Sequence, residues 1–168
     1  SCLENGDNIL YAVEKGINVV EDDADTGKHV VGRGGFPNEN GILECDAAIM
    51  DGNGCRFGAV AAVQGIATPF SVARLVMEKS RHSLLVGDGA QLFAKEHGIS
   101  VLSNDMLQTE SSTNAYKEFL KTKENSSVYA TPGHDTIGVL ARDFQGNVVA
   151  GTSTSGKPFK SFGRVGDS

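Results

Sequence analysis

The sequence predicts one domain of the α/β class, of the α+β type, with helices covering a sheet built from antiparallel strand pairs. Three observations lead to this class. A length of 168 residues fits a single domain and is enough to bury a hydrophobic core. Apolar spacings typical of helices alternate along the chain with two hairpin patterns. The 21 glycines follow no repeat period, which indicates tight turns rather than low complexity.

The first predicted element is a helix over residues 8–21, with Asp7 as its N-cap. Its apolar positions recur at spacings of four, four and three residues and form one stripe: Ile9, Val13, Ile17 and Val20. An acidic run follows at residues 21–25. Its spacing is not that of a calcium loop, so we expect a solvent-exposed acidic turn there.

A β-hairpin is expected next. Two short apolar segments, at residues 45–50 and 57–63, flank the turn-forming sequence Asp-Gly-Asn-Gly at 51–54. Residues 32–41, before the hairpin, contain four glycines but neither of the spacings with which glycine-rich loops bind phosphate. We therefore predict a structural loop over that segment.

The middle of the chain is predicted to be largely helical. One helix begins with Pro69 at its first position and continues to residue 79. A short strand is expected at 84–86, followed by a helix over 90–96 that Asp88 caps. That helix stops at the His-Gly pair which follows it.

The second half is more polar and ends in a second predicted hairpin. One helix is expected near residues 115–121, and residues 121–133 have the composition of an exposed linker. Strands are predicted at 137–142 and 148–151 with a turn between them. The residues with the most distinctive chemistry lie around this hairpin.

Charge and cysteine content exclude several classes of protein. The net charge of −6 and the pI near 5.1 disfavour a nucleic-acid partner, which requires a basic surface. No window holds the ~18 apolar residues of a membrane span, and residues 1–16 lack the features of a signal peptide. The three cysteines are odd in number and have no CxxC spacing, so we expect neither a metal site nor a disulfide framework.

His134, Asp135 and Thr136 stand directly before the second hairpin. A threonine hydroxyl is a weak nucleophile unless a base lies beside it. Cleavage of the peptide bond before Thr136 would create such a base, because the new α-amine has a pKa of about 8 and accepts the hydroxyl proton. The Asp135 carboxylate would assist an N-to-O acyl shift at that bond. The alternative is that Thr136 is an ordinary β-branched residue at the start of a strand.

Two further polar groups follow. A hydroxyl run covers residues 152–155, and the hairpin would bring it beside Thr136; the alternative is a solvent-facing strand end. Arg164 and Asp167 lie three residues apart within GRVGDS. Arginine holds a carboxylate with two parallel hydrogen bonds and aspartate holds an ammonium, so the pair suits a free amino-acid head group. The alternative is a surface ion pair.

The string HDTIGVLARDFQGNVVAGTSTSG followed by GRVGDS resembles the glycosylasparaginases (aspartylglucosaminidases) of the N-terminal-nucleophile hydrolases. Earlier segments carry the resemblance along nearly the whole chain: AVEKGINVVEDD, GGFPNENG, DAAIMDG, PFSVARLVMEKS and LLVGDGAQLFA. The family also includes plant-type asparaginases, isoaspartyl peptidases and threonine aspartase. The resemblance implies an αββα sandwich and a single-chain precursor that cleaves itself before Thr136.

The resemblance also implies a role for each matching residue. Thr136 attacks the side-chain amide of an asparagine derivative and forms a β-aspartyl ester, which water hydrolyses. Thr154 tunes this nucleophile. Arg164 binds the substrate α-carboxylate and Asp167 its α-amino group. Neither a metal nor an organic cofactor takes part.

Two features favour the glycosylasparaginase branch. Asparaginases and isoaspartyl peptidases of the family have Gly before the nucleophile and continue with TSTGG, whereas this chain has His-Asp before Thr136 and continues with TSTSG. We therefore expect N4-(β-N-acetylglucosaminyl)-L-asparagine as the substrate. The alternatives are an isoaspartyl peptidase or L-asparaginase of the same fold, and an inactive domain that only binds an amino acid or is purely structural.

The resemblance finally predicts how the chain is organised. The family has a strand before the first matching helix and, after GRVGDS, further strands and a Thr-Gly pair that supplies the oxyanion hole. We therefore expect a precursor fragment, incomplete at both ends, with residues 1–135 from the α-subunit and 136–168 beginning the β-subunit. Family members associate as dimers of cleaved heterodimers, and a periplasmic or lysosomal location is implied.

Overall fold

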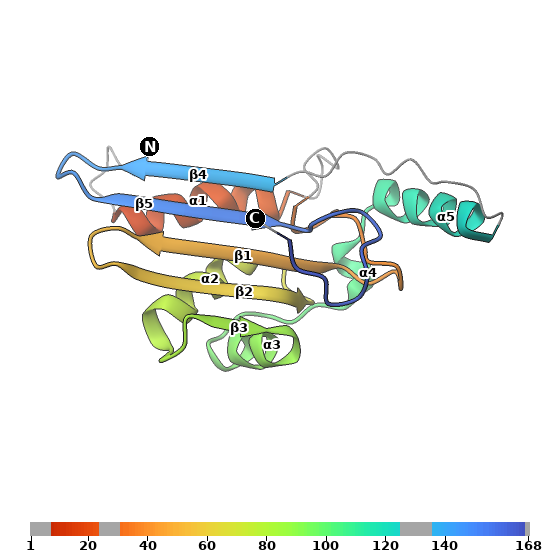
Figure 1. The fold of residues 1–168 in the computed structure, drawn as a ribbon, viewed down its shortest axis with the longest axis horizontal. Helices are drawn as coiled ribbons and strands as arrows, with labels where there is room; N and C mark the ends of the chain where they lie inside the picture. The colour runs from red at the N-terminus through yellow and green to blue at the C-terminus, as the bar shows by residue number, and fades with distance from the viewer. Residues whose placement is uncertain (1–7, 24–30, 125–135, 167–168) are drawn as a thin grey trace.

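The computed structural model describes residues 8–23, 31–124 and 136–166, which form a five-stranded mixed sheet with helices against it (Figure 1). The strands are β1 (Glu44–Asp51), β2 (Arg56–Gln64), β3 (Leu84–Val86), β4 (Thr136–Arg142) and β5 (Val148–Thr154). Their order across the sheet is β3-β2-β1-β5-β4. Neighbouring strands are antiparallel except β2 and β3, which are parallel. The predicted mixed class with antiparallel pairs is confirmed, while the parallel pair has no counterpart in the predictions.

Three helices cover one face of this sheet. The helices are α1 (Ile9–Glu21), α2 (Pro69–Lys79), α3 (Gly87–Glu96), α4 (Asn104–Leu107) and α5 (Glu110–Glu124). α1 packs on β4 and β5, α2 on β1 and β2, and α3 on β2. In Figure 1, α1 and α2 are seen behind the strands. α5 extends to the side, beyond the ends of the strands (Figure 1). Within the described ranges, none of the helices combines the length and the apolar character that a membrane crossing requires.

The hydrophobic core lies between the helices and the sheet. Phe70 of α2 and Ile17 of α1 are fully buried there. A Cβ on Gly151 of β5 would lie 2.6 Å from the Phe70 ring and 3.1 Å from Ile17. Glycine at this position therefore lets both side chains reach the sheet backbone, and it marks where the two helices meet β5.

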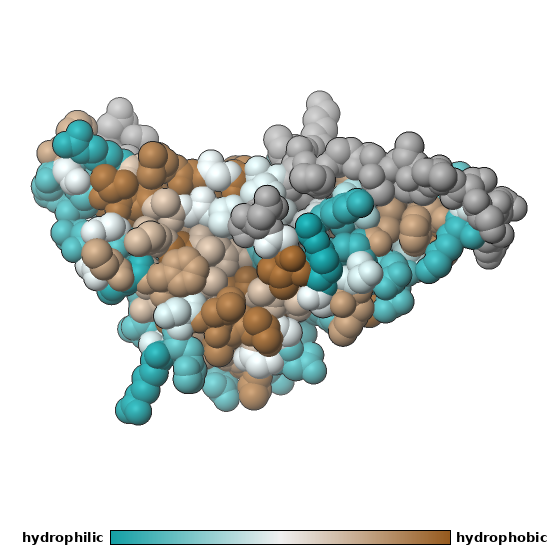
Figure 2. All heavy atoms as spheres, in the orientation of Figure 1, coloured by the Kyte–Doolittle hydropathy of each residue, from teal (hydrophilic) through white to brown (hydrophobic). Residues whose placement is uncertain are grey.

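The other face of the sheet is exposed and apolar. Leu140 is 76% exposed and Met50 49%, and both belong to the face opposite the helices. Figure 2 shows hydrophobic residues gathered over this side of the molecule. The expected αββα sandwich requires a second sheet, and residues 8–23, 31–124 and 136–166 contain this one sheet only.

Several predicted boundaries agree with the structure. The first hairpin, the helix beginning with Pro69 and the strand at 84–86 all form where they are expected. The helix predicted at 90–96 forms the later part of α3, which stops at His97 as expected. Gly98 then adopts a φ of +81°. The segment 32–41 is a loop without helix or strand, as predicted.

Other boundaries are wrong. Asn8, rather than Asp7, is the N-cap of α1, and its side chain accepts a hydrogen bond from the Leu10 N–H at 2.8 Å. Asp88 does not cap α3 because that helix already begins at Gly87.

The second half departs further from the predictions. α4 was not expected, and α5 is longer than the predicted helix at 115–121. Residues 121–124 of the predicted linker are therefore helical, and 125–133 lie outside the described residues. β5 continues three residues beyond its predicted end, so the first three hydroxyl residues of the run belong to the strand.

The expectation of an exposed acidic turn is wrong for its first residue. Glu21 is fully buried at the end of α1. Its Oε1 accepts hydrogen bonds from the Ser153 hydroxyl at 2.6 Å and from the Phe70 N–H at 2.9 Å. One carboxylate thus links α1, β5 and the first turn of α2. Asp22, the next residue, is exposed as predicted and accepts from Arg33 Nε at 2.7 Å.

Burial raises the pKa of Glu21 from its ordinary value of 4.5 to about 7, against the opposing effect of its two hydrogen bonds. Because the folded pKa is the higher one, this group stabilises the fold most below pH 4.5, and the contribution is lost as the pH rises through 7. A rise from pH 5 to pH 8 should therefore lower the free energy of unfolding by about 2–3 kcal/mol through this one carboxyl group.

Glu21→Gln should remove this part of the pH dependence, because glutamine does not titrate. Urea unfolding at pH 5 and pH 8 measures the effect. The exposed control Glu96→Gln removes the same charge and should retain the wild-type dependence. An unchanged pH dependence in Glu21→Gln would contradict the assignment.

Candidate functional site

Three polar residues form a row across adjacent strands. Thr136, the first residue of β4, is paired with Thr154, the last residue of β5. Thr154 is in turn paired with Asp46 of β1. Directly opposed residues in an antiparallel pair project to the same face, so the three side chains share the face of the sheet opposite the helices.

The two threonine hydroxyls contact each other. The Thr136 hydroxyl donates to Thr154 Oγ1 at 3.1 Å. The Gly156 N–H donates to the same oxygen at 2.9 Å. Thr136 is exposed whereas Thr154 is buried, so a fixed hydroxyl lies under an accessible one. The structure thus brings together the two threonines that the sequence singled out.

Ser153 and Ser155 of the hydroxyl run are buried. Ser153 projects to the helical side, where its hydroxyl donates to Glu21. Ser155 is fully buried, and a Cβ on Gly35 would lie 2.7 Å from its side chain. The alternative of a solvent-facing strand end is therefore wrong for residues 153–155.

Arg164 lies near Gly156, and Gly156 in turn contacts the pair of threonine hydroxyls. A Cβ on Gly156 would lie 3.3 Å from Arg164 Nη1, and Gly156 is the residue whose N–H binds Thr154. Arg164 is exposed. His134, Asp135 and Asp167 lie outside the described residues, so the predicted Arg164–Asp167 pair and the bond before Thr136 do too.

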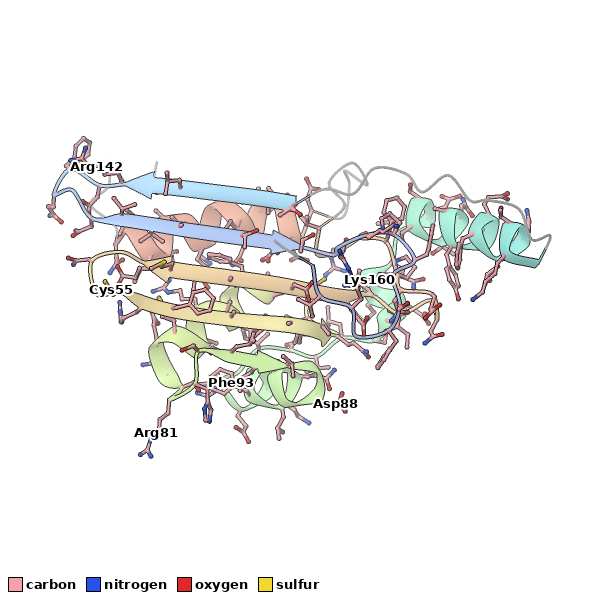
Figure 3. All side chains as sticks on the ribbon, viewed as in Figure 1. Cys55, Arg81, Asp88, Phe93, Arg142 and Lys160 are labelled. Atoms are coloured by element: carbon pink, nitrogen blue, oxygen red, sulfur yellow. The ribbon has the colours of Figure 1, made fainter. Side chains whose placement is uncertain are left out.

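Sequence reasoning missed a buried group beside this site. Lys160 Nζ donates to the Glu44 carbonyl at 3.1 Å and lies 3.9 Å from Asp46 Oδ2. Figure 3 shows Lys160 in the loop after β5, near the start of β1. Burial raises the pKa of Asp46, while its hydrogen bond from the Ala62 N–H and the Lys160 charge act in the other direction. The sequence signal was Asp46, a charged residue within the otherwise apolar segment 45–50.

The described residues contain no group of three or more His, Cys, Asp or Glu arranged to hold a metal ion. What they do contain is a helix-covered mixed sheet with paired threonine hydroxyls at the start of one strand. A threonine hydroxyl becomes an effective nucleophile when a base, such as its own N-terminal amine, lies beside it.

Comparison with known proteins gives the family. The model of the family Asparaginase_2, described as asparaginase, matches residues 1–168. The chain therefore belongs to this asparaginase family of N-terminal-nucleophile hydrolases.

Relatives with two different names are similar to the chain. An N(4)-(β-N-acetylglucosaminyl)-L-asparaginase of Elizabethkingia miricola is 45% identical over 99% of this chain and 47% of its own length. An isoaspartyl peptidase/L-asparaginase of Xenopus laevis is 45% identical over 98% of this chain and 52% of its own length. The human protein with that name is 39% identical over 99% of this chain and 53% of its own length. The chain thus spans about half the length of the curated relatives it matches.

Replacement of Thr154 tests the hydroxyl pair. Thr154→Val keeps the side-chain shape but removes the acceptor of the Gly156 N–H and the Thr136 hydroxyl. A buried N–H without a partner costs about 1–3 kcal/mol, so we expect a loss of that size in the free energy of unfolding. Thr154→Ser retains the acceptor and should lose less. Equal stability of wild type and Thr154→Val in urea unfolding would show that the oxygen is not needed.

Proposed function

We propose that this chain supplies the nucleophile and part of the substrate site of an amidohydrolase that cleaves N4-(β-N-acetylglucosaminyl)-L-asparagine. The observation that carries the proposal is the 3.1 Å contact between the exposed Thr136 hydroxyl and the buried Thr154 hydroxyl. Family membership supports hydrolysis of an asparagine derivative as the reaction class.

The reaction begins with cleavage of the chain itself. Thr136 Oγ attacks the carbonyl carbon of Asp135, the C–N bond breaks as the Thr136 nitrogen takes up a proton, and an ester is left. Water then hydrolyses this ester, which frees the Thr136 α-amine. Asp135 assists this shift, and His134 precedes it in the same motif. In this order of events the residue that attacks its own backbone later attacks the substrate.

The freed amine then acts as the base for substrate hydrolysis. It accepts the Thr136 hydroxyl proton while Oγ attacks the side-chain amide carbon of the substrate. The leaving glycosylamine departs with that proton, and a β-aspartyl ester remains on Thr136. Water hydrolyses the ester and releases aspartate. Thr154 keeps the nucleophile oriented, since its own oxygen is fixed by the Gly156 N–H.

Substrate binding is assigned to the segment after β5. Arg164 holds the α-carboxylate with two parallel hydrogen bonds, and Asp167 holds the α-ammonium. The position of Arg164 near Gly156 supports this role. The reaction as written needs no metal and no organic cofactor.

The complete protein is proposed to work as a cleaved heterodimer, with residues up to 135 in one subunit and Thr136 at the start of the other. Two heterodimers associate, outside the cytoplasm in the periplasm or lysosome, without nucleic acid or membrane as partners. The negative net charge supports the absence of nucleic acid.

One observation favours a second candidate function. The Xenopus laevis isoaspartyl peptidase/L-asparaginase is as similar to this chain as the bacterial N(4)-(β-N-acetylglucosaminyl)-L-asparaginase. Hydrolysis of β-aspartyl peptides or of asparagine is therefore the alternative. The His-Asp pair before Thr136 and the serine at position 155 support the first candidate.

Self-cleavage is tested by mass spectrometry of the full-length protein. We expect a new fragment that begins at Thr136 and loss of the intact chain. Thr136→Ala should remain intact, because alanine has no hydroxyl to attack the bond. A wild-type protein that hydrolyses its substrate while its chain stays whole would overturn the mechanism. A whole chain without hydrolysis would favour a silent, amino-acid-binding domain.

The leaving group is tested by kinetics of the cleaved protein. We expect kcat/KM for glycosylasparagine to exceed that for a β-aspartyl dipeptide and for L-asparagine by at least about tenfold, which corresponds to 1.4 kcal/mol of transition-state discrimination. The opposite order would assign the protein to the isoaspartyl peptidase and asparaginase branch. The three substrates share the aspartyl group, so the comparison isolates the leaving group.

A further inference from the structure

Three ionisable side chains lie buried beside the candidate site and have no part in the proposed reaction. Glu44, Asp46 and Lys160 are 1%, 3% and 4% exposed. Two of them lie at the start of β1 and the third in the loop that follows β5. Burial of charged groups costs free energy unless they are well paired, so this buried charge cluster needs an explanation.

Glu44 contacts the segment leading to Arg164 with both its backbone and its side chain. Its carbonyl oxygen accepts a hydrogen bond from Lys160 Nζ at 3.1 Å. Its carboxylate oxygens lie 3.1 and 3.3 Å from the Gly163 nitrogen, which donates to them. Gly163 directly precedes Arg164. Glu44 therefore holds the backbone beside Arg164 at one point and the loop before it at another.

The backbone of Lys160 is fixed independently of its ammonium group. The Glu39 N–H donates to the Lys160 carbonyl at 2.8 Å. The side chain reaches inward, to the Glu44 carbonyl and to within 3.9 Å of Asp46 Oδ2. Removal of the ammonium would thus leave the Glu39 contact in place and take away the inner hydrogen bond and the charge.

Lys160 and Arg164 both lie close to Gly156, and the positive charges of both side chains affect the Asp46 carboxylate. A Cβ on Gly156 would lie 3.2 Å from Lys160 Nζ and 3.3 Å from Arg164 Nη1. Burial raises the pKa of Asp46, and the charges of both cations oppose that shift. As long as Lys160 is present, Asp46 has a neighbouring cation besides Arg164. The guanidinium is then less strongly drawn inward to Asp46.

We propose that Glu44 and Lys160 are positioning residues for Arg164: Glu44 fixes the backbone at Gly163, and Lys160 pairs with Asp46 so that the guanidinium remains available to a ligand carboxylate. This inference rests on the proposed function, in which Arg164 binds the α-carboxylate of the substrate. Neither Glu44 nor Lys160 touches the substrate.

The test compares two substrates that differ only at the carboxylate. For the cleaved full-length protein, kcat/KM is measured with glycosylasparagine and with its α-carboxamide, and the ratio of the two values is the readout. The concentration of active enzyme cancels in this ratio, so a variant that folds poorly still gives an answer. A structural defect alone lowers both values and leaves their ratio unchanged.

We expect Glu44→Gln and Lys160→Met each to lower this ratio by at least about tenfold, since misplacement of a binding group by about 1 Å can cost about 10²-fold. Lys160→Arg keeps the charge and should recover most of the ratio. Lys157→Met is the matched control: it removes an exposed lysine of the same loop and should keep the wild-type ratio.

A double-mutant cycle shows whether the two residues act through Arg164. Arg164→Ala should abolish the carboxylate preference, and addition of Glu44→Gln or Lys160→Met should lower it no further. A wild-type ratio in both single variants would overturn the positioning role while the proposed function stands. A wild-type protein that hydrolyses neither substrate would overturn the proposed function and this inference together.

Discussion

The register between β4 and β5 is the constraint on which the site depends. Side chains alternate between the two faces of a sheet, so a slip of one residue would move Thr136 from one face to the other. In the observed register Thr136 is opposite Thr154, and Thr154 is opposite Asp46. Ser153, the residue directly before Thr154 in sequence, then faces the helices and reaches Glu21. One strand therefore serves the site with one face and the core with the other.

Glu21 ties this register to the helical layer. Its carboxylate binds Ser153 of β5 and the Phe70 N–H of α2 with the same oxygen. The bond from Ser153 forms only when that side chain points toward the helices, which excludes the slipped register. A buried carboxylate is a costly group, and an apolar residue would pack with less desolvation. Glu21 lies where α1, α2 and β5 meet, and we interpret its role as selecting the observed register of β5. This selection costs stability above the pKa of Glu21.

The sequence was sufficient wherever the relevant contact is local. The second hairpin could be predicted from its turn and its apolar strands, and with it the proximity of Thr136 and Thr154. Glu21 could not, because its partners Phe70 and Ser153 are 49 and 132 residues away. An acidic run looks the same whether its first member is solvated or buried. Lys160 was missed for the same reason, since its partner Glu44 lies 116 residues earlier in the chain.

The apolar face of the sheet bears on how the protein is handled in a cell whenever that face is accessible. Leu140 and Met50 lie on it, and Figure 2 shows a broad hydrophobic area on this side of the molecule. Chaperones and proteases recognise surfaces of this kind as signs of an unfinished molecule. Any copy in which this face stays uncovered is therefore open to degradation by proteases. Burial of the face would protect the correctly assembled molecules.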